Sequence, residues 1–183
     1  WRNALLALVI LPFWTSFLVR MYAWIVLLRS EGVVNLALGA AGLPPADLLY
    51  NDFAVLLGQL YGELPFMIIP LYVSLEKLDP SLLEAAADLG ADARRTFTRV
   101  VVPQTMPGIV AGCVLVFIPS LGAYLAPDLL GGGKTAYIGN LIQSQFAVAR
   151  DMPFGAALSF VLSLVVVLLL LAFRRPLRSA QAL

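Results

Sequence analysis

The sequence contains no histidine, a single cysteine and few charged residues. Of its 183 residues, 13% are charged, against about a quarter in a typical soluble domain. Without histidine, and with Cys113 as the only thiol, a His/Cys metal site, an internal disulfide bond and a Ser-His or Cys-His nucleophile are excluded. The 12 basic and 11 acidic residues nearly cancel, so the basic excess of a nucleic-acid-binding protein is missing too. We therefore expect no catalytic residue, cofactor, metal ion or nucleic-acid partner.

Long apolar stretches dominate the sequence instead. The chain is 61% hydrophobic and its mean hydropathy is +0.90. Four stretches reach the roughly 20 residues that a helix needs to cross a bilayer. They are residues 4–28, 53–75, 107–127 and 152–173, of which the first contains Arg20 and the second Glu63. The sequence thus predicts an all-α fold, a polytopic transmembrane helical bundle of four spans in a single domain, residues 1–183.

The basic residues of the connections indicate the orientation of these spans. If both ends of the chain and the central connection are cytoplasmic, most Lys and Arg residues lie inside, as the positive-inside rule requires. Those residues are Arg2, Lys77, Arg94, Arg95, Arg99, Arg174, Arg175 and Arg178. Only Arg29, Lys134 and Arg150 then lie outside. We expect residues 76–106 to be cytoplasmic.

Two pairs of glycines stand four residues apart within the spans. Gly58 and Gly62 belong to the second span, and Gly108 and Gly112 to the third. Small residues at this spacing let helix backbones approach closely. We expect them to serve helix packing.

The central connection has the pattern of two short helices. Either Asp79, followed by Pro80, or Ser81 together with Glu84 can cap the first helix. Gly90 stands where a helix ends in a left-handed residue. The apolar face of the first helix comprises Leu82, Leu83, Ala86 and Leu89. A second helix is expected from about Asp92 through Arg94, Arg95 and Phe97 until Pro103 stops it.

This segment resembles the EAA motif of ABC importer permeases. The matching residues are Glu84, Ala85, Ala86, Gly90 and Pro103, with three residues before the glycine and an apolar run before the proline. Stretches such as LPFWTSFLVRMYAWIVLL and PQTMPGIVAGCVLVFIPSLGAY resemble the spermidine/putrescine permeases, first of their two permease types. The resemblance implies a type I ABC importer permease core of six spans, of which we expect the last four here and the first two to be absent.

The resemblance also implies partners. In such importers the EAA segment docks on a dimer of cytoplasmic ATP-binding subunits, beside a second permease subunit and a periplasmic substrate-binding protein. The expected substrate is a polyamine, and the expected location is a bacterial inner membrane, in contact with lipid. Two alternatives are an ABC permease for another small solute and an ion-driven secondary transporter. A third is a purely structural membrane subunit.

Residues 128–135, DLLGGGKT, end like a phosphate-binding loop. The motif requires a glycine where this chain has Asp128, a carboxylate that repels phosphate. The stretch also follows a predicted span rather than a buried strand. We expect a glycine turn outside the membrane.

Ionisable groups in predicted spans are candidate substrate contacts, because burying charge in a membrane is costly. Arg20 and Glu63 can form a structural ion pair or line the pathway. Asp128 lies one helical turn beyond Tyr124 in the predicted third span, and a carboxylate with an aromatic ring suits an ammonium group. The candidate pathway residues are Asp128, Tyr124, Glu63 and Trp24. Trp24, like Tyr22, Tyr61 and Tyr72, can instead belong to an interfacial aromatic belt.

Overall fold

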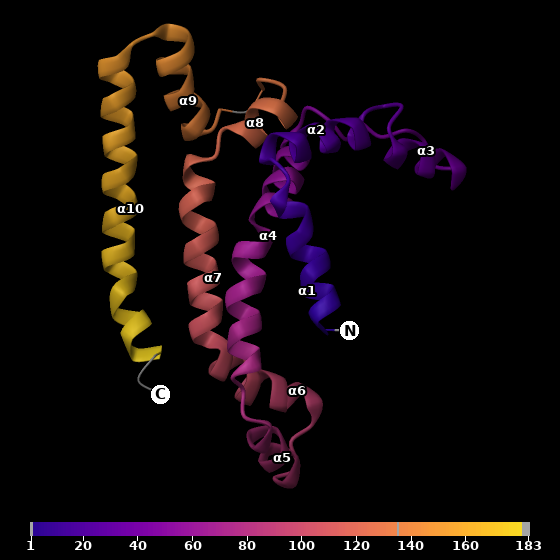
Figure 1. The fold of residues 1–183 in the computed structure, drawn as a ribbon, viewed down its shortest axis with the longest axis vertical. Helices are drawn as coiled ribbons and strands as arrows, with labels where there is room; N and C mark the ends of the chain where they lie inside the picture. The colour runs from indigo at the N-terminus through magenta and orange to yellow at the C-terminus, as the bar shows by residue number, and fades with distance from the viewer. Residues whose placement is uncertain (1, 135, 181–183) are drawn as a thin grey trace. The chain divides into compact units, whose positions relative to one another are not determined.

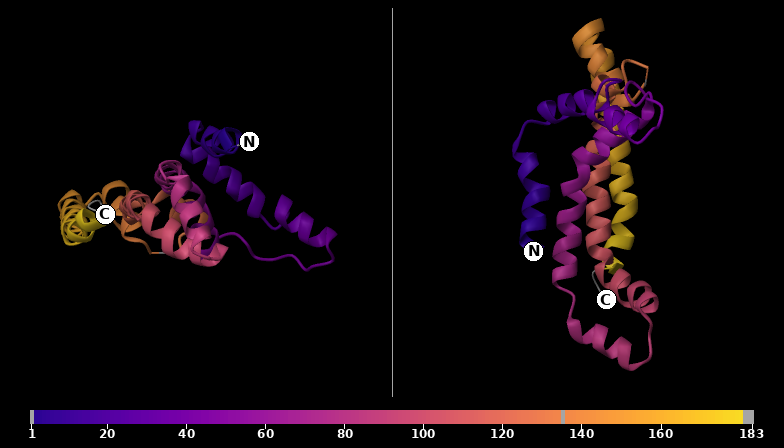
Figure 2. Two further views of the ribbon diagram at one scale, coloured as in Figure 1. Left: turned by 90° about the horizontal axis from the view of Figure 1, so that it is seen from below. Right: turned by 90° about the vertical axis from the view of Figure 1, so that its right-hand side faces the viewer.

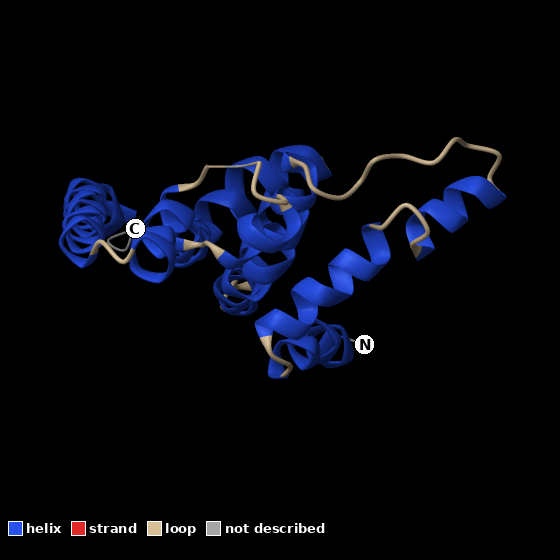
Figure 3. Cartoon of the chain, turned by 90° about the horizontal axis from the view of Figure 1, so that it is seen from above, coloured by secondary structure: helices blue, strands red, loops and turns tan. Residues whose placement is uncertain are grey.

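The computed structural model describes residues 2–134 and 136–180, with side chains described for residues 4–134 and 136–171. All regular elements within these residues are helical (Figure 3). In chain order (Figure 1) they are α1 (Arg2–Ile10), the 3-10 helix η1 (Leu11–Trp14), α2 (Phe17–Leu28), α3 (Val33–Ala40), α4 (Asp52–Glu76), α5 (Pro80–Asp88), α6 (Ala93–Thr96), the π-helix η2 (Phe97–Val101), α7 (Val102–Gly122), α8 (Leu125–Leu130), α9 (Ile138–Ser144), the π-helix η3 (Gln145–Ala149) and α10 (Met152–Ala180). The expected all-α fold is confirmed.

The helices form two compact units built from segments distant in sequence. The first unit comprises Trp1–Pro65 and Pro119–Val161, and the second comprises Phe66–Ile118 and Leu162–Leu183. Helices α4, α7 and α10 each pass from one unit to the other. Each of these three helices therefore contributes residues to both units.

The core of the first unit lies between α2, α4 and α8. Its buried side chains are Met21, Leu28, Ala54, Val55, Ala126 and Leu130. An added Cβ at Gly58 would collide with Leu130, and one at Gly62 would lie 2.7 Å from Cε2 of Phe17. Both glycines are therefore packing positions, as predicted.

In the second unit α4 and α7 lie side by side (Figures 1 and 2). A Cβ at Gly108 would lie 2.6 Å from the carbonyl oxygen of Pro70 and would also meet Ser74. A Cβ at Gly112 would lie 2.6 Å from Sδ of Met67. The second glycine pair thus also brings two helices close together.

Four helical stretches among the described residues are long and apolar enough to cross a membrane. They are Phe17–Ala40, Asp52–Glu76, Ala93–Gly122 and Met152–Leu171. The number of spans agrees with the sequence prediction, and the second and fourth have nearly the expected bounds. The first and third differ.

The prediction of one continuous helix over residues 4–28 is wrong. Pro12 has no N–H to continue an α-helix and its ring clashes with the preceding turn, and α1 gives way to η1 around it. The hydroxyl and the backbone N–H of Thr15 both donate to the carbonyl of Pro12, at 2.6 and 3.2 Å. Thr15 then takes an extended conformation, with ψ 155°. The next helix, α2, starts only at Phe17.

The third predicted span, residues 107–127, is wrong at its C-terminal end. Helix α7 stops at Gly122, and Tyr124 leaves the helical conformation with φ −126° to become the N-cap of α8. A separate helix therefore carries Asp128.

Candidate functional site

Helix α5 begins with a side-chain cap from Asp79. The backbone N–H of Ser81 donates to Oδ1 of Asp79 at 2.9 Å, and Pro80 occupies the first helical position. This hydrogen bond favours the carboxylate and holds the pKa of Asp79 below its ordinary value. Of the two predicted caps, Asp79 forms and the Ser81–Glu84 capping box does not.

Gly90 ends α5 in the left-handed conformation that the sequence predicts. Its φ is +74°. The N–H of Ala91 donates to the carbonyl of Ala86 at 3.0 Å, and the N–H of Gly90 donates to that of Ala87 at 2.8 Å. This pair of hydrogen bonds is the Schellman motif. A Cβ on Gly90 would have no described atom within 4 Å, so glycine is favoured here by backbone conformation alone.

The motif residues of α5 differ in exposure. Glu84 and Ala85 are exposed, whereas Ala86 is only 8% exposed. Leu89, next to the glycine bend, is 88% exposed. Helix α5 thus turns Ala86 inward and leaves Glu84, Ala85 and Leu89 accessible.

The prediction that Pro103 stops the second helix is wrong. The helix runs unbroken from Ala93 to Gly122. The π-helical turn η2 precedes the proline, and the N–H of Val102 donates to the carbonyl of Phe97 five residues back. Because a π-turn is wider than an α-turn, it gives the proline ring room beside the preceding carbonyls. Helix α6 therefore leads into α7 without a non-helical residue, although it turns aside from the axis of α7 (Figure 1).

Arg20 is held by aromatic rings in the first unit. Its guanidinium carbon lies 4.1 Å from the ring centroid of Phe13 and 5.5 Å from that of Phe17. Its buried Nε and Nη1 have no hydrogen-bond partner among the described residues. The ring faces attract its positive charge.

The ion pair between Arg20 and Glu63, one of the two roles predicted for them, is not formed within the described residues. Gly62 faces α2, and Glu63 lies about 100° further around α4. Glu63 instead shares a face with Gln59, one turn away, whose amide donates to the carbonyl of Ser120 at 3.2 Å. Oε2 of Glu63 is buried without a hydrogen-bond partner among the described residues.

The remaining pathway candidates lie on α2 and at the start of α8. Trp24 packs edge-on against Tyr61, with ring centroids 5.6 Å apart. Asp128 and Tyr124 are both exposed, and the backbone N–H of Asp128 donates to the carbonyl of Tyr124 at 2.9 Å. Tyr124 and Asp128 therefore stay one helical turn apart at the start of α8, although α7 ends at Gly122.

The stretch after α8 is a glycine turn, as predicted. Gly132 and Gly133 have φ +61° and +73°, and the N–H of Lys134 donates to the carbonyl of Gly131. Thr135, the last residue of the DLLGGGKT stretch, lies outside the described residues. The turn packs on Tyr50, since a Cβ at Gly132 would lie 2.8 Å from Cδ1 of that ring.

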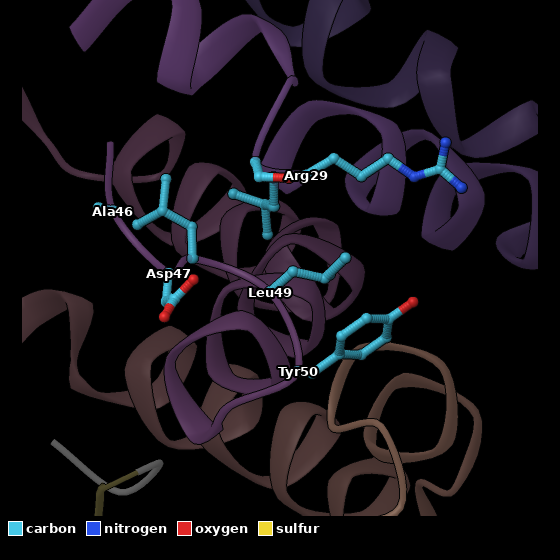
Figure 4. A pocket seen from close by; sticks show the side chains of 8 residues that line it. Arg29, Ala46, Asp47, Leu49 and Tyr50 are labelled. Carbon is cyan, nitrogen blue, oxygen red and sulfur yellow. The ribbon is translucent and has the colours of Figure 1, made fainter. Parts of the chain in front are cut away.

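The buried Asn35 of the first unit was missed by sequence reasoning. Asn35 is 5% exposed, and its amide donates to the carbonyls of Arg29 and Ala46 while its oxygen accepts from the N–H of Ala46. These hydrogen bonds hold residues 46–50 beside the end of α2 and shape a cavity of about 260 Å³ (Figure 4). The cavity is lined by Leu28, Arg29, Ser30, Ala46, Asp47, Leu48, Leu49 and Tyr50. A lone amide in the apolar run VVNLALGA was the available signal.

These features define a polytopic α-helical membrane protein with an exposed helix–glycine–helix segment. The family of binding-protein-dependent transport system inner membrane components matches residues 1–176, and the chain belongs to this family. The family consists of transport components rather than enzymes.

Curated relatives agree with this assignment. The chain is 48% identical over 179 residues to the spermidine/putrescine transport system permease protein PotB of Escherichia coli, and 47% identical over 177 residues to that of Haemophilus influenzae. These alignments cover 97% and 96% of this chain, but 65% and 62% of the relatives. The inner membrane ABC transporter permease protein YdcU of E. coli is 39% identical over 96% of this chain and 59% of its own length. The similarity expected from the sequence is confirmed, over less than two thirds of these relatives.

Proposed function

We propose that the chain is a permease subunit of an ABC importer for polyamines such as spermidine or putrescine. The similarity to spermidine/putrescine permeases along 97% of the chain carries this proposal. The proposed assembly places the chain in a bacterial inner membrane, with both its ends and residues 76–106 in the cytoplasm. Its partners are a second permease subunit, a dimer of ATP-binding subunits and a periplasmic substrate-binding protein.

Helix α5 and the Gly90 bend form the proposed coupling segment. The exposed Glu84 can pair with a basic residue of an ATP-binding subunit, and the small Ala85 permits close approach. Ala86 and Gly90 set the shape of the segment rather than its outer surface. Pro103 lies within the unbroken helix Ala93–Gly122, so a movement of α6 can reach α7 without passing a non-helical residue.

Glu63 is the strongest pathway candidate. Its buried Oε2 has no hydrogen-bond partner among the described residues, and a carboxylate in this state attracts an ammonium group. Trp24 can add a ring face to a cation nearby. Asp128 and Tyr124, both exposed, suit a first contact with the substrate outside the membrane.

Uptake into membrane vesicles tests the substrate assignment. The full-length chain with its partner subunits should take up labelled spermidine or putrescine only with ATP and binding protein present. Glu63→Gln should lower uptake at least tenfold without changing assembly. The control is Gln59→Glu, which adds a charge on the same face of α4 instead of removing one. A chain that transports an amino acid or an anion, unaffected by excess polyamine, would refute the polyamine assignment.

Another solute is the second candidate for the substrate. The similarity to a permease whose name specifies no solute keeps this alternative open. Measuring spermidine uptake in the presence of competing amino acids, anions or cations distinguishes a polyamine substrate from another solute. Membership in a binding-protein-dependent family favours ATP-driven import over an ion-driven secondary transporter.

A further inference from the structure

The helix that includes α6, η2 and α7 is longer than a membrane requires. As a straight helix its 30 residues, Ala93–Gly122, would measure about 45 Å, whereas the hydrocarbon core of a bilayer is about 30 Å thick. Residues 100–122 contain no charge and alone extend about 34 Å. The part before Val100 therefore extends past the hydrocarbon.

This protruding part carries three arginines within six residues. Arg94, Arg95 and Arg99 are exposed, and their side chains form no hydrogen bond or ion pair with the described residues. Asp92 is the nearest acidic residue in sequence, and its Oδ1 accepts the backbone N–H of Arg95 at 2.7 Å. The cluster is thus a net positive patch without an internal counter-ion among the described residues.

The depth of the patch matches that of lipid headgroups. Arg94 stands about 9 Å along the helix axis from Val100, and each headgroup layer of a bilayer is roughly 5 to 8 Å thick. The motif residues Glu84 and Ala85 lie on α5, whereas the arginines follow the Gly90 bend, on α6 and η2. Anionic phosphate groups at this depth offer the acceptors that guanidinium groups prefer.

We propose that Arg94, Arg95 and Arg99 form a binding site for anionic phospholipid headgroups. The site anchors the start of the α6–α7 helix at the membrane surface, next to the proposed coupling segment. It rests on the proposed membrane placement but not on the identity of the solute.

Native mass spectrometry of the full-length chain in its assembled transporter tests this site. Protein from nanodiscs of mixed phosphatidylglycerol and phosphatidylcholine should retain phosphatidylglycerol in preference. Each arginine near a membrane surface strengthens anionic binding roughly fivefold, so the triple variant Arg94→Gln, Arg95→Gln, Arg99→Gln should reduce phosphatidylglycerol retention at least tenfold. Replacing the three residues by lysine should restore much of it, and Lys134→Gln should change nothing.

Two results would overturn the proposal. One is equal retention of the two lipids by the unmodified and the triple-glutamine proteins. The other is loss of the ATP-binding subunits from the triple-glutamine protein with phosphatidylglycerol retention unchanged, which would assign the arginines to a protein contact. Polyamine uptake is measured separately, so failure of the substrate assignment leaves this result readable.

Discussion

The N–H of Ala91 donates to the carbonyl of Ala86 at 3.0 Å, closing α5 across the left-handed Gly90. This hydrogen bond fixes the direction in which the chain leaves α5 and enters α6. The positive φ of one residue thus determines the shape of the proposed coupling segment.

Replacing Gly90 by alanine should strain this bend. An L-residue in the left-handed region costs about 1 to 2 kcal/mol, while the added methyl group meets no described atom. We expect Gly90→Ala to lower coupling of ATP hydrolysis to uptake with little change in the melting temperature of the whole assembly. Gly90→Asn, which tolerates this conformation, should retain most of the coupling. Equal coupling in the unmodified and alanine proteins would contradict this reading of the bend.

Asp79 should stabilise α5 only as a carboxylate. Its folded pKa lies below the ordinary value of 3.8, so its contribution is fully present above that pH and is lost as the pH falls through the folded pKa. Hydrogen exchange of the amides of Ser81 and Leu82 should therefore be protected at neutral pH and lose protection in acid below about pH 4. Asp79→Ala should remove this protection at neutral pH, and Asp79→Asn should preserve much of it without the acid dependence.

Gly108 and Gly39 should respond oppositely to substitution. Gly108→Val forces atoms into Pro70 and Ser74 and should destabilise the protein by about 1 to 3 kcal/mol. Gly39→Ala, in α3, meets nothing within 4 Å and should stabilise by up to about 1 kcal/mol. Thermal unfolding in one detergent compares the two, and equal destabilisation would show that the α4–α7 contact is not tight.

Asn35 should be essential to the folding of residues 29–50. Asn35→Ala leaves the backbone groups of Ala46 unpaired and should cost about 1 to 3 kcal/mol. Leu36→Ala, at a neighbouring position that is 67% exposed, is the matched control and should cost much less. Proteolysis within residues 43–50 should become faster in the Asn35 variant alone.

The sequence was sufficient to predict elements and contacts that depend on local spacing. The helical class, four spans, the Gly90 bend and the packing role of the glycine pairs all follow from apolar runs and small-residue spacing. The Asp79 cap was one of two predicted alternatives, and only the structure shows which one forms.

Features that depend on how neighbouring helices face each other were beyond sequence reasoning. An ion pair is one of the two roles predicted for Arg20 and Glu63. Arg20 lies instead against the rings of Phe13 and Phe17. Pro103 was predicted as a helix end because the π-turn that accommodates it has no sequence signature. The three hydrogen bonds of Asn35 join residues that are six and eleven positions apart, in a loop without a recognisable pattern.

Paired measurement of ATP hydrolysis and spermidine uptake in the Glu84→Ala transporter tests the central claim most directly. Glu84 is exposed on α5 and its side chain forms no hydrogen bond or ion pair with the described residues, so the substitution should leave folding unchanged. The account predicts that assembly with the ATP-binding subunits weakens and uptake falls at least tenfold. Uptake at the unmodified rate, with α5 found on the periplasmic side by labelling of Asp88→Cys, would contradict it.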